Sequence, residues 1–274
     1  MLHGIDVSNN NGVVDWVKAA AAPVDFAFVK ASEGIGYYDP LFTANWTGIK
    51  AAGIGVRGVY HFCHPELNSP EQEAEWYTRI IAEYMQPGDI PVLDCEVGGT
   101  QDNSGWLMAC GAAVGKILGF PCGVYSYLDY IQRCLQDSGL AAMWLWLAAY
   151  GSQMPASPVP WDKYLIWQYS QSGTIPGISG NCDLNQADCT IADLQRLGKP
   201  FPIVAHAARV KVACSLKSLP SRKAPSRVLA EIPGPPHGLI IDTGERHTTG
   251  ANTWARVQFR NEYGWVIASN VRKV

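Results

Sequence analysis

Short apolar runs of strand-forming residues alternate with helix-compatible stretches through the first 190 residues, and this alternation constrains the fold more than any other feature. Eight candidate strands cover residues 4–8, 26–32, 55–62, 90–97, 123–127, 144–150, 165–170 and 182–184. Helix-compatible stretches separate the first six strands and cover residues 16–22, 41–52, 70–85, 105–118 and 130–136. Strands that alternate with helices indicate parallel βα units, which predicts the α/β fold class.

The last two connections between these strands are too rich in proline and glycine for crossover helices. Residues 151–163 contain three prolines, and residues 171–181 contain Gly173, Pro176, Gly177 and Gly180. Both connections therefore indicate loops. We expect a TIM-like barrel of eight strands and five helices whose final strands are joined by loops alone, with an ordinary eightfold βα barrel as the alternative. Residues 191–197 are a candidate closing helix.

The charge of the chain changes sign near residue 202, which indicates two domains with different partners. Residues 1–202 carry 10 Lys and Arg against 20 Asp and Glu, a net of −10, whereas residues 203–274 carry 11 against 4, a net of +7. We expect a first domain at 1–197, a linker at 198–203 and a second domain at 204–274. A polyanion, such as an anionic wall polymer or nucleic acid, would explain the positive charge, and a generic basic surface is the alternative.

The second domain has the pattern of a small all-β barrel. Short apolar runs cover residues 208–213, 226–232, 238–243, 253–259 and 264–268, and the turn at 261–264 is typical of a hairpin.

Targeting segments and metal or redox motifs are not recognisable. The first residues lack the charged and apolar regions of a signal peptide, and no apolar stretch reaches the length of a membrane span, so we expect synthesis in a cytoplasm and no membrane partner.

The eight cysteines include no CxxC pair, so free buried thiols are expected, with a bond between Cys182 and Cys189 as the alternative. His61 and His64 lack a matching ligand set, so neither a metal nor another cofactor is expected.

Acidic residues recur in the candidate strands. Asp94 and Glu96 lie two apart in an apolar strand, so they point to one side with Cα atoms about 6.6 Å apart. Two such carboxylates are costly unless they are used or paired, although a solvated strand end is the alternative.

Two more acids lie in neighbouring strands of the expected barrel, because Asp6 is in the first strand and Asp183 in the eighth. Functional groups of such barrels gather at the carboxyl ends of strands, so all four acids are expected in one cleft. Crowded carboxylates raise one another's pKa, and one protonated acid beside one carboxylate is the equipment for glycoside hydrolysis.

Motifs in the same order along residues 2–190 resemble those of glycoside hydrolase family 25, the muramidases of phages and bacteria. They are Asp6-Val7-Ser8, Phe28 to Gly34, Gly58 to Phe62, Asp94-x-Glu96, Gly123 to Ser126, Trp146 to Tyr150, Trp167 to Ser170 and Asp183-Leu184-Asn185. The resemblance implies a barrel of eight strands and five helices. It also implies hydrolysis of the β-1,4 bond between N-acetylmuramic acid and N-acetylglucosamine in peptidoglycan.

The resemblance also implies roles for the acids. Glu96 would be the general acid/base, and Asp94 would stabilise the transition state or assist the N-acetyl group of the substrate. Asp6 and Asp183 would orient and tune both. The strand spacing does not decide between a covalent and a substrate-assisted route, although the family is usually taken as retaining.

Further residues near the strand ends are candidates for binding the substrate. The rings of Tyr60, Tyr125, Tyr150, Trp167 and Tyr169 are candidates for stacking on sugars, with core packing as the alternative for each. Candidates for polar contacts are Glu33, Lys30 and Gln168, and Lys30 is alternatively an ion-pair partner of Asp94 or Glu33.

The second domain resembles a bacterial SH3-like domain through Val210-Lys211-Val212, Trp254 to Val257 and Tyr263 to Val266. The resemblance implies a bacterial cell wall, and no nucleic acid, as its partner. Together the two domains suggest a phage endolysin, made in the host cytoplasm and acting at the wall after release, although a bacterial lysozyme exported by another route would look the same. Two competing hypotheses for the barrel are a protein that only binds glycan and a chitinase-like glycosidase.

Overall fold

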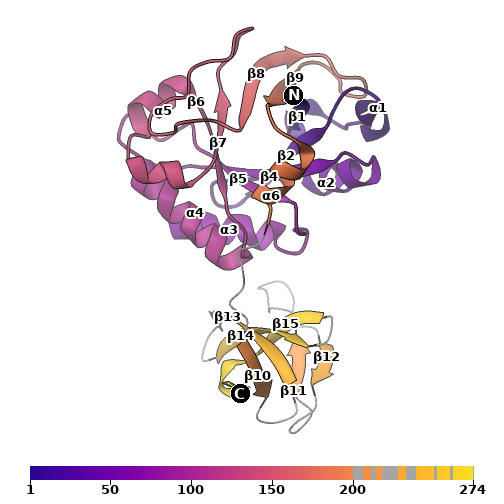
Figure 1. Ribbon diagram of the computed structural model, residues 1–274, viewed down its shortest axis with the longest axis vertical. Coiled ribbons are helices and arrows are strands. Elements are labelled where there is room, and N and C mark those ends of the chain that lie inside the picture. Colours follow the sequence, from indigo (N-terminus) through magenta and orange to yellow (C-terminus); the bar gives the residue numbers. More distant parts are fainter. Residues whose placement is uncertain are drawn as a thin grey trace. The chain divides into compact units, whose positions relative to one another are not determined.

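A computed structural model describes residues 1–199, 206–210, 214–217, 228–232, 239–249, 252–259 and 262–273. The chain divides into two compact units, Met1–Phe201 and Pro202–Val274 (Figure 1). Most of the expected linker at 198–203 lies outside the described residues, so its bounds stay a prediction.

The first unit is a closed barrel of eight strands, as expected. They are β1 (Leu2–Val7), β2 (Phe26–Glu33), β4 (Val56–Phe62), β5 (Ile90–Asp94), β6 (Gly123–Tyr127), β7 (Leu145–Ala148), β8 (Ile166–Gly173) and β9 (Cys182–Ala187). Pairing of β1 with β2 closes the ring, and the short β3 (Tyr37–Tyr38) extends β2 at its edge. Neighbouring barrel strands are parallel except that β9 runs antiparallel to both β1 and β8. The loop at 174–181 is too short for the crossover that a parallel strand needs.

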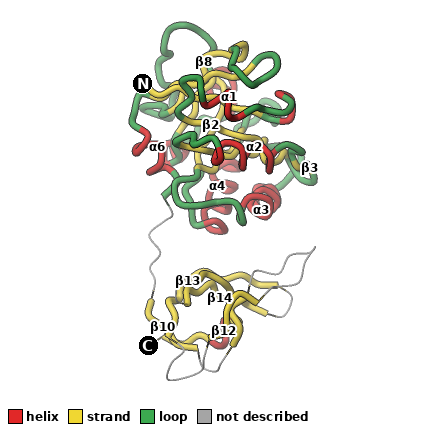
Figure 2. Tube along the Cα trace, turned by 90° about the vertical axis from the view of Figure 1, so that its right-hand side faces the viewer, coloured by secondary structure: helices red, strands yellow, loops and turns green. Residues whose placement is uncertain are grey.

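Helices surround the barrel where the sequence predicts them (Figure 2). They are α1 (Trp16–Ala20), α2 (Phe42–Ala51), α3 (Pro70–Ile81), α4 (Ser104–Leu118), α5 (Leu128–Cys134) and the closing helix α6 (Ile191–Leu197), with 3₁₀ turns at Asn9–Asn11 and Ser138–Ala142. At the start of α3, the Ser69 hydroxyl accepts from the Gln72 amide in a capping box, and Pro70 occupies the first turn. None of the helices in the described part of the chain has the length and apolar composition to span a membrane.

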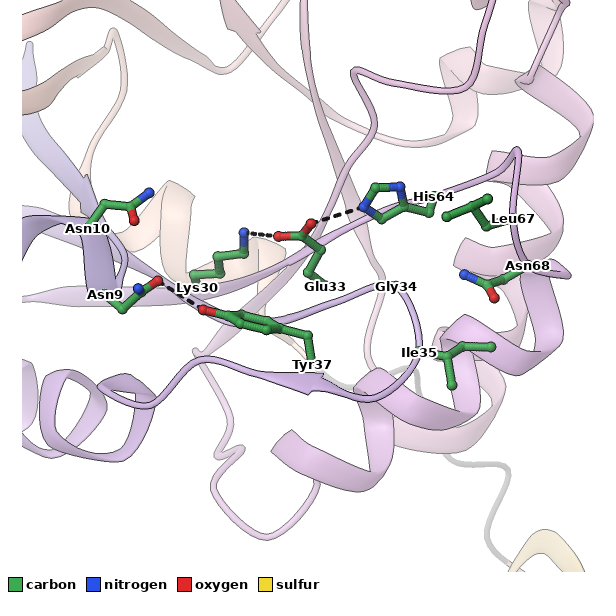
Figure 3. Close-up of a pocket in the computed structure, with 10 residues that line it drawn as sticks. All are labelled: Asn9, Asn10, Lys30, Glu33, Gly34, Ile35, Tyr37, His64, Leu67 and Asn68. Carbon is green, nitrogen blue, oxygen red and sulfur yellow. Dashed lines mark hydrogen bonds and ion pairs between the residues drawn. The ribbon is translucent and has the colours of Figure 1, made fainter.

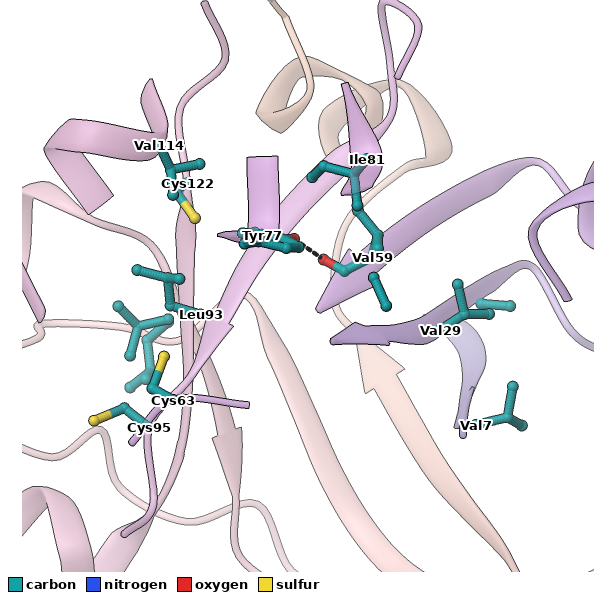
Figure 4. Packing of buried hydrophobic residues seen from close by; sticks show 14 of the residues in the cluster. Val7, Val29, Val59, Cys63, Tyr77, Ile81, Leu93, Cys95, Val114 and Cys122 are labelled. Atoms are coloured by element: carbon teal, nitrogen blue, oxygen red, sulfur yellow. Dashed lines mark hydrogen bonds between the residues drawn. The ribbon is translucent and has the colours of Figure 1, made fainter. Parts of the chain in front are cut away.

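The core of the barrel has two layers because side chains alternate across each strand. Phe26, Phe28 and Trp146 pack inside the barrel, whereas Val29 and Leu93 point outward against the helices (Figure 4). The seven cysteines of the barrel are free thiols, all but one buried, so the expected thiols are confirmed and the alternative bond between residues 182 and 189 is absent.

In its described residues, the second unit consists of strands and one 3₁₀ turn, Ala268–Asn270, and all of the described strand pairs are antiparallel. Its strands are β10 (His206–Val210), β11 (Cys214–Lys217), β12 (Val228–Ile232), β13 (Leu239–Thr249), β14 (Asn252–Phe259), β15 (Glu262–Ile267) and β16 (Val271–Lys273). Ile232, Ala255, Val257 and Val266 form its buried cluster. The expected hairpin pairs β14 with β15, from Phe259 opposite Glu262. The sequence did not predict β11 or β16, which are only four and three residues long.

Candidate active site

The four acids lie at one end of the barrel. Asp6 on β1 is directly opposite Asp183 on β9, and Asp94 is the last residue of β5. Glu96 lies two residues further, outside the strand. The expectation that the strand continues to residue 97 was wrong, because the chain leaves the sheet before Gly98 and Gly99, whose positive φ angles of 123° and 77° are unsuited to a strand.

Asp6 and Asp183 form a hydrogen-bonded carboxyl pair. The Asp6 carboxylate also accepts from the side-chain amides of Asn185 at 2.7 Å and Gln168 at 2.9 Å. Burial first, and then repulsion from Asp183, raise the pKa of Asp6 to about 8 despite the two amide donors. Burial also raises the pKa of Asp183. The pair therefore retains one proton at neutral pH.

Asp94 and Glu96 form the second carboxyl pair. Asp94 is buried, and its Oδ1 atom has no hydrogen-bond partner within the described residues. Burial and then the neighbouring Glu96 raise the pKa of Asp94 well above its ordinary value, against the opposing charge of Lys30. Burial likewise raises the pKa of the half-buried Glu96, with Lys30 opposing and Asp183 adding to the rise. Because these shifts link acids on β1, β5 and β9, the four carboxyls share one site.

Three of the predicted tyrosines face these acids. Burial first, and then charges that include Asp6, raise the pKa of Tyr60, Tyr125 and Tyr150. The Tyr125 hydroxyl donates to Gln168 Oε1 at 3.0 Å, so this ring is fixed in place. Tyr150 is 55% exposed and presents the most open ring surface of the three.

Trp167 and Tyr169 lie on the other face of β8. Ile166 and Gln168 point into the barrel, so strand alternation turns their neighbours outward. Trp167 is buried, donates to the carbonyl of Ala149 at 2.7 Å and packs beside Tyr169 with ring centres 5.6 Å apart. Stacking of these two rings on a sugar therefore stays a prediction.

Lys30 and Glu33 meet each other beside the acids. Lys30 Nζ is 2.6 Å from Glu33 Oε2, and His64 Nε2 is 3.0 Å from the other carboxylate oxygen. Burial of Glu33 favours its neutral form, but the hydrogen bonds from Lys30 and His64 outweigh this effect and lower its pKa. The alternative interpretation of Lys30 as an ion-pair partner of Glu33 is therefore correct, and contact of either residue with substrate stays a prediction.

Asn185 and Trp146 are site residues that the sequence reasoning did not assign. Trp146 Nε1 donates to Asn185 Oδ1 at 2.8 Å, which orients the Asn185 amide toward Asp6. The signal was present, because Asn185 lies two residues after Asp183 and shares its face of the strand.

His61, Cys63 and Glu73 are close enough to hold a metal ion, with their ligand atoms within 4.8 Å of one another. Both ring nitrogens of the buried His61 are already hydrogen-bonded, Nδ1 to Ser32 Oγ at 2.8 Å and Nε2 to Glu73 Oε2 at 3.0 Å. The group is therefore a satisfied hydrogen-bond network that ties β4 to α3.

Comparison with known proteins gives the family of this barrel. The family model of glycosyl hydrolases family 25 matches residues 5–178. The chain belongs to this family. It is therefore a glycoside hydrolase, in agreement with the crowded carboxyls. Lysozyme M1 of Streptomyces globisporus is 30% identical over 209 residues, which cover 72% of this chain and 71% of that protein.

Solved structures of a lysozyme and of an endolysin are also similar. A bacterial lysozyme from Streptomyces coelicolor has a TM-score of 0.67 at 28% identity and covers 72% of this chain and 96% of its own. The CTP1L endolysin has a TM-score of 0.64 at 32% identity, covering 72% of this chain and 70% of its own. The resemblance found in the sequence motifs is thus confirmed at the level of the family and of the barrel.

Proposed function

We propose that this family 25 enzyme is a peptidoglycan muramidase that hydrolyses the β-1,4 bond between N-acetylmuramic acid and N-acetylglucosamine. The observation that carries the proposal is the pair of Asp94, buried with an unpartnered Oδ1 atom, and Glu96, whose pKa is raised beside it. Lysozymes among its relatives supply the substrate class.

Glu96 is the general acid/base in this proposal. It is only half-buried and follows the strand end, so its carboxyl is accessible, and its raised pKa keeps a proton available for the leaving oxygen. Asp94 lies deeper, and in its ionised form it stabilises developing positive charge or assists the N-acetyl group. Asp6 and Asp183 hold a proton between them, and the charge of Asp183 raises the pKa of Glu96.

The test compares wild type with Glu96→Gln and Asp94→Asn on purified cell walls. We expect both variants to lose activity, Glu96→Gln by roughly 10²- to 10⁴-fold. The exposed Glu83→Gln is a matched control that keeps full activity. Clearing by Glu96→Gln at the wild-type rate would refute its role. Mass spectrometry of the products distinguishes the two cleavage specificities, because muramic acid at the new reducing end identifies a muramidase and N-acetylglucosamine a chitinase-like cleavage. Wall binding without new reducing ends would identify a non-catalytic protein.

We further propose that residues 204–274 form an SH3-like domain that holds the enzyme on the bacterial wall, and that the protein acts as a phage endolysin, made in the host cytoplasm and released to the wall. The net charge of +7, the motifs around Trp254 and Trp265 and the all-β antiparallel strands support the wall domain. The similarity to the CTP1L endolysin supports the endolysin role.

The wall-domain proposal is tested by deleting residues 203–274. We expect weaker wall binding and retained cleavage of soluble glycan fragments, and binding of the full chain should weaken with added salt. Unchanged wall affinity after the deletion would refute the anchor.

A further inference from the structure

A pocket of about 440 Å³, which the proposed reaction does not use, is lined by residues of β2 and β3 and of the segments that follow β1, β2 and β4 (Figure 3). The pocket adjoins the strands that carry the acids, because Asn9 and Asn10 closely follow β1, which bears Asp6, and Lys30 lies on the neighbouring β2. The charge of Lys30 also lowers the pKa of both Asp94 and Glu96.

We infer that this pocket binds the short peptide stem that muramic acid carries on its lactyl group. The inference rests on the proposed function, since the stem is carried by muramic acid, the sugar whose β-1,4 bond to N-acetylglucosamine a muramidase cleaves. The occupant would be a short, alanine-containing peptide with a free carboxylate.

Unused amide groups are the first observation in favour of a peptide. Asn9, Asn10 and Asn68 all line the pocket. Within the described residues, the whole side chain of Asn10, the amide nitrogen of Asn9 and the amide oxygen of Asn68 make no hydrogen bond. Carboxamides offer donors and acceptors together, which is what a peptide backbone needs.

Exposed aliphatic side chains are the second observation. Ile35 is 47% exposed and Leu67 is 71% exposed, and both line the pocket. Aliphatic surface of this size suits alanine methyl groups and the methylenes of a peptide stem.

The charged residues are held in place and still offer donors. Glu33 binds Lys30 on one side and His64 on the other, as Figure 3 shows. Lys30 is an ammonium with three donors, of which one is used by Glu33, so donors are available for a stem carboxylate.

A further sugar ring fits these observations less well. The aromatic ring that lines the pocket is Tyr37, whose hydroxyl donates to Asn9 Oδ1 at 3.0 Å. Lys30 Nζ lies over the same ring, 5.6 Å from its centre, and takes up one face that a sugar would need for stacking.

The kinetic experiment uses one set of glycan strands in two forms, with their peptide stems and after removal of the stems by an amidase. The variants are Asn10→Ala and Leu67→Ala, and Val17→Ala, 77% exposed on α1, is the control. Each pocket variant loses one contact of about 1 kcal/mol, so we expect KM to rise about 3- to 10-fold on stem-bearing strands with kcat unchanged. On stem-free strands KM should not change. Equal effects of a variant on both substrates, or no effect on either, would overturn the inference.

A binding experiment keeps the inference testable if the enzyme proves inactive. N-acetylmuramoyl-L-alanyl-D-isoglutamine and N-acetylmuramic acid are titrated separately into the full-length Glu96→Gln variant, and the side-chain amide resonances of Asn10 and Asn68 are followed by NMR. We expect shifts with the muramoyl dipeptide that the sugar alone does not produce. Identical responses to both compounds, or none to the dipeptide, refute the pocket assignment whatever the outcome of the wall-clearing assay.

Discussion

Replacing Asp6 by Asn should stabilise the barrel at neutral pH while reducing activity. Asp6 is buried against Asp183, and its Oδ2 atom accepts hydrogen bonds from Gln168 and Asn185. An asparagine oxygen can accept the same two bonds, while its amide group donates to Asp183. The substitution therefore removes a buried acid and keeps the hydrogen bonds.

The magnitude follows from the pKa of Asp6, which rises from an ordinary value of 3.8 to about 8 in the folded protein. A raised pKa means that the stability due to this group is complete below pH 3.8 and is lost as the pH rises toward 8. Because pH 7 lies about three pH units above the ordinary pKa, the stability lost at pH 7 is about 4 kcal/mol at 1.36 kcal/mol per unit. Near pH 4 it is less than about 1 kcal/mol.

The assay is unfolding of wild type and Asp6→Asn by urea and by heat between pH 4 and pH 8. Tryptophan fluorescence reports mainly on the barrel, which contains eight of the ten tryptophans. We expect the free energy of unfolding of Asp6→Asn at pH 7 to exceed that of wild type by about 4 kcal/mol, which corresponds to about 10 °C in Tm. The difference should shrink toward pH 4. Asp15→Asn is the control, because the exposed Asp15 has a pKa lowered by its hydrogen bonds to Lys18 and should give no gain at pH 7. A variant with equal or lower stability at pH 7, or a gain independent of pH, would show that Asp6 carries no electrostatic cost.

Two other substitutions test the electrostatics and the hydrogen bonds of the site. Lys30→Gln removes the positive charge that lowers the pKa of Asp94 and Glu96, so both pKa values should rise. The alkaline limb of the pH–activity profile should therefore move to higher pH. An unmoved limb would show that the charge of Lys30 does not act on these acids. Tyr125→Phe leaves the buried Gln168 oxygen without its donor and should cost about 1–3 kcal/mol in urea unfolding, whereas a neutral effect would mean that water or another donor replaces the hydroxyl.

The order of strands and helices in the barrel could be predicted because hydrophobic period and turn residues are local signals. The ends of strands were harder to predict. Val97 continues the apolar alternation past Glu96, so the sequence indicates one longer strand, but the backbone of Gly98 turns away. The direction in which a side chain points was also hard to predict from the sequence. Trp167 is adjacent to Gln168 in the sequence, yet only Gln168 reaches the acids, because which of two neighbours faces inward depends on the register of β8.

The convergence of the acids was predicted correctly but for an incomplete reason. The sequence predicts Asp183 in the cleft because active sites of parallel barrels lie at the carboxyl ends of strands. In the structure, Asp183 lies near the beginning of β9, whereas Asp6 lies near the end of β1. A parallel β9 would carry Asp183 to the opposite end of the barrel. The antiparallel pairing places it directly across from Asp6, and that direction follows from the short loop at 174–181. The loop length, as much as the acid itself, therefore determines that a second carboxyl pair forms beside Glu96.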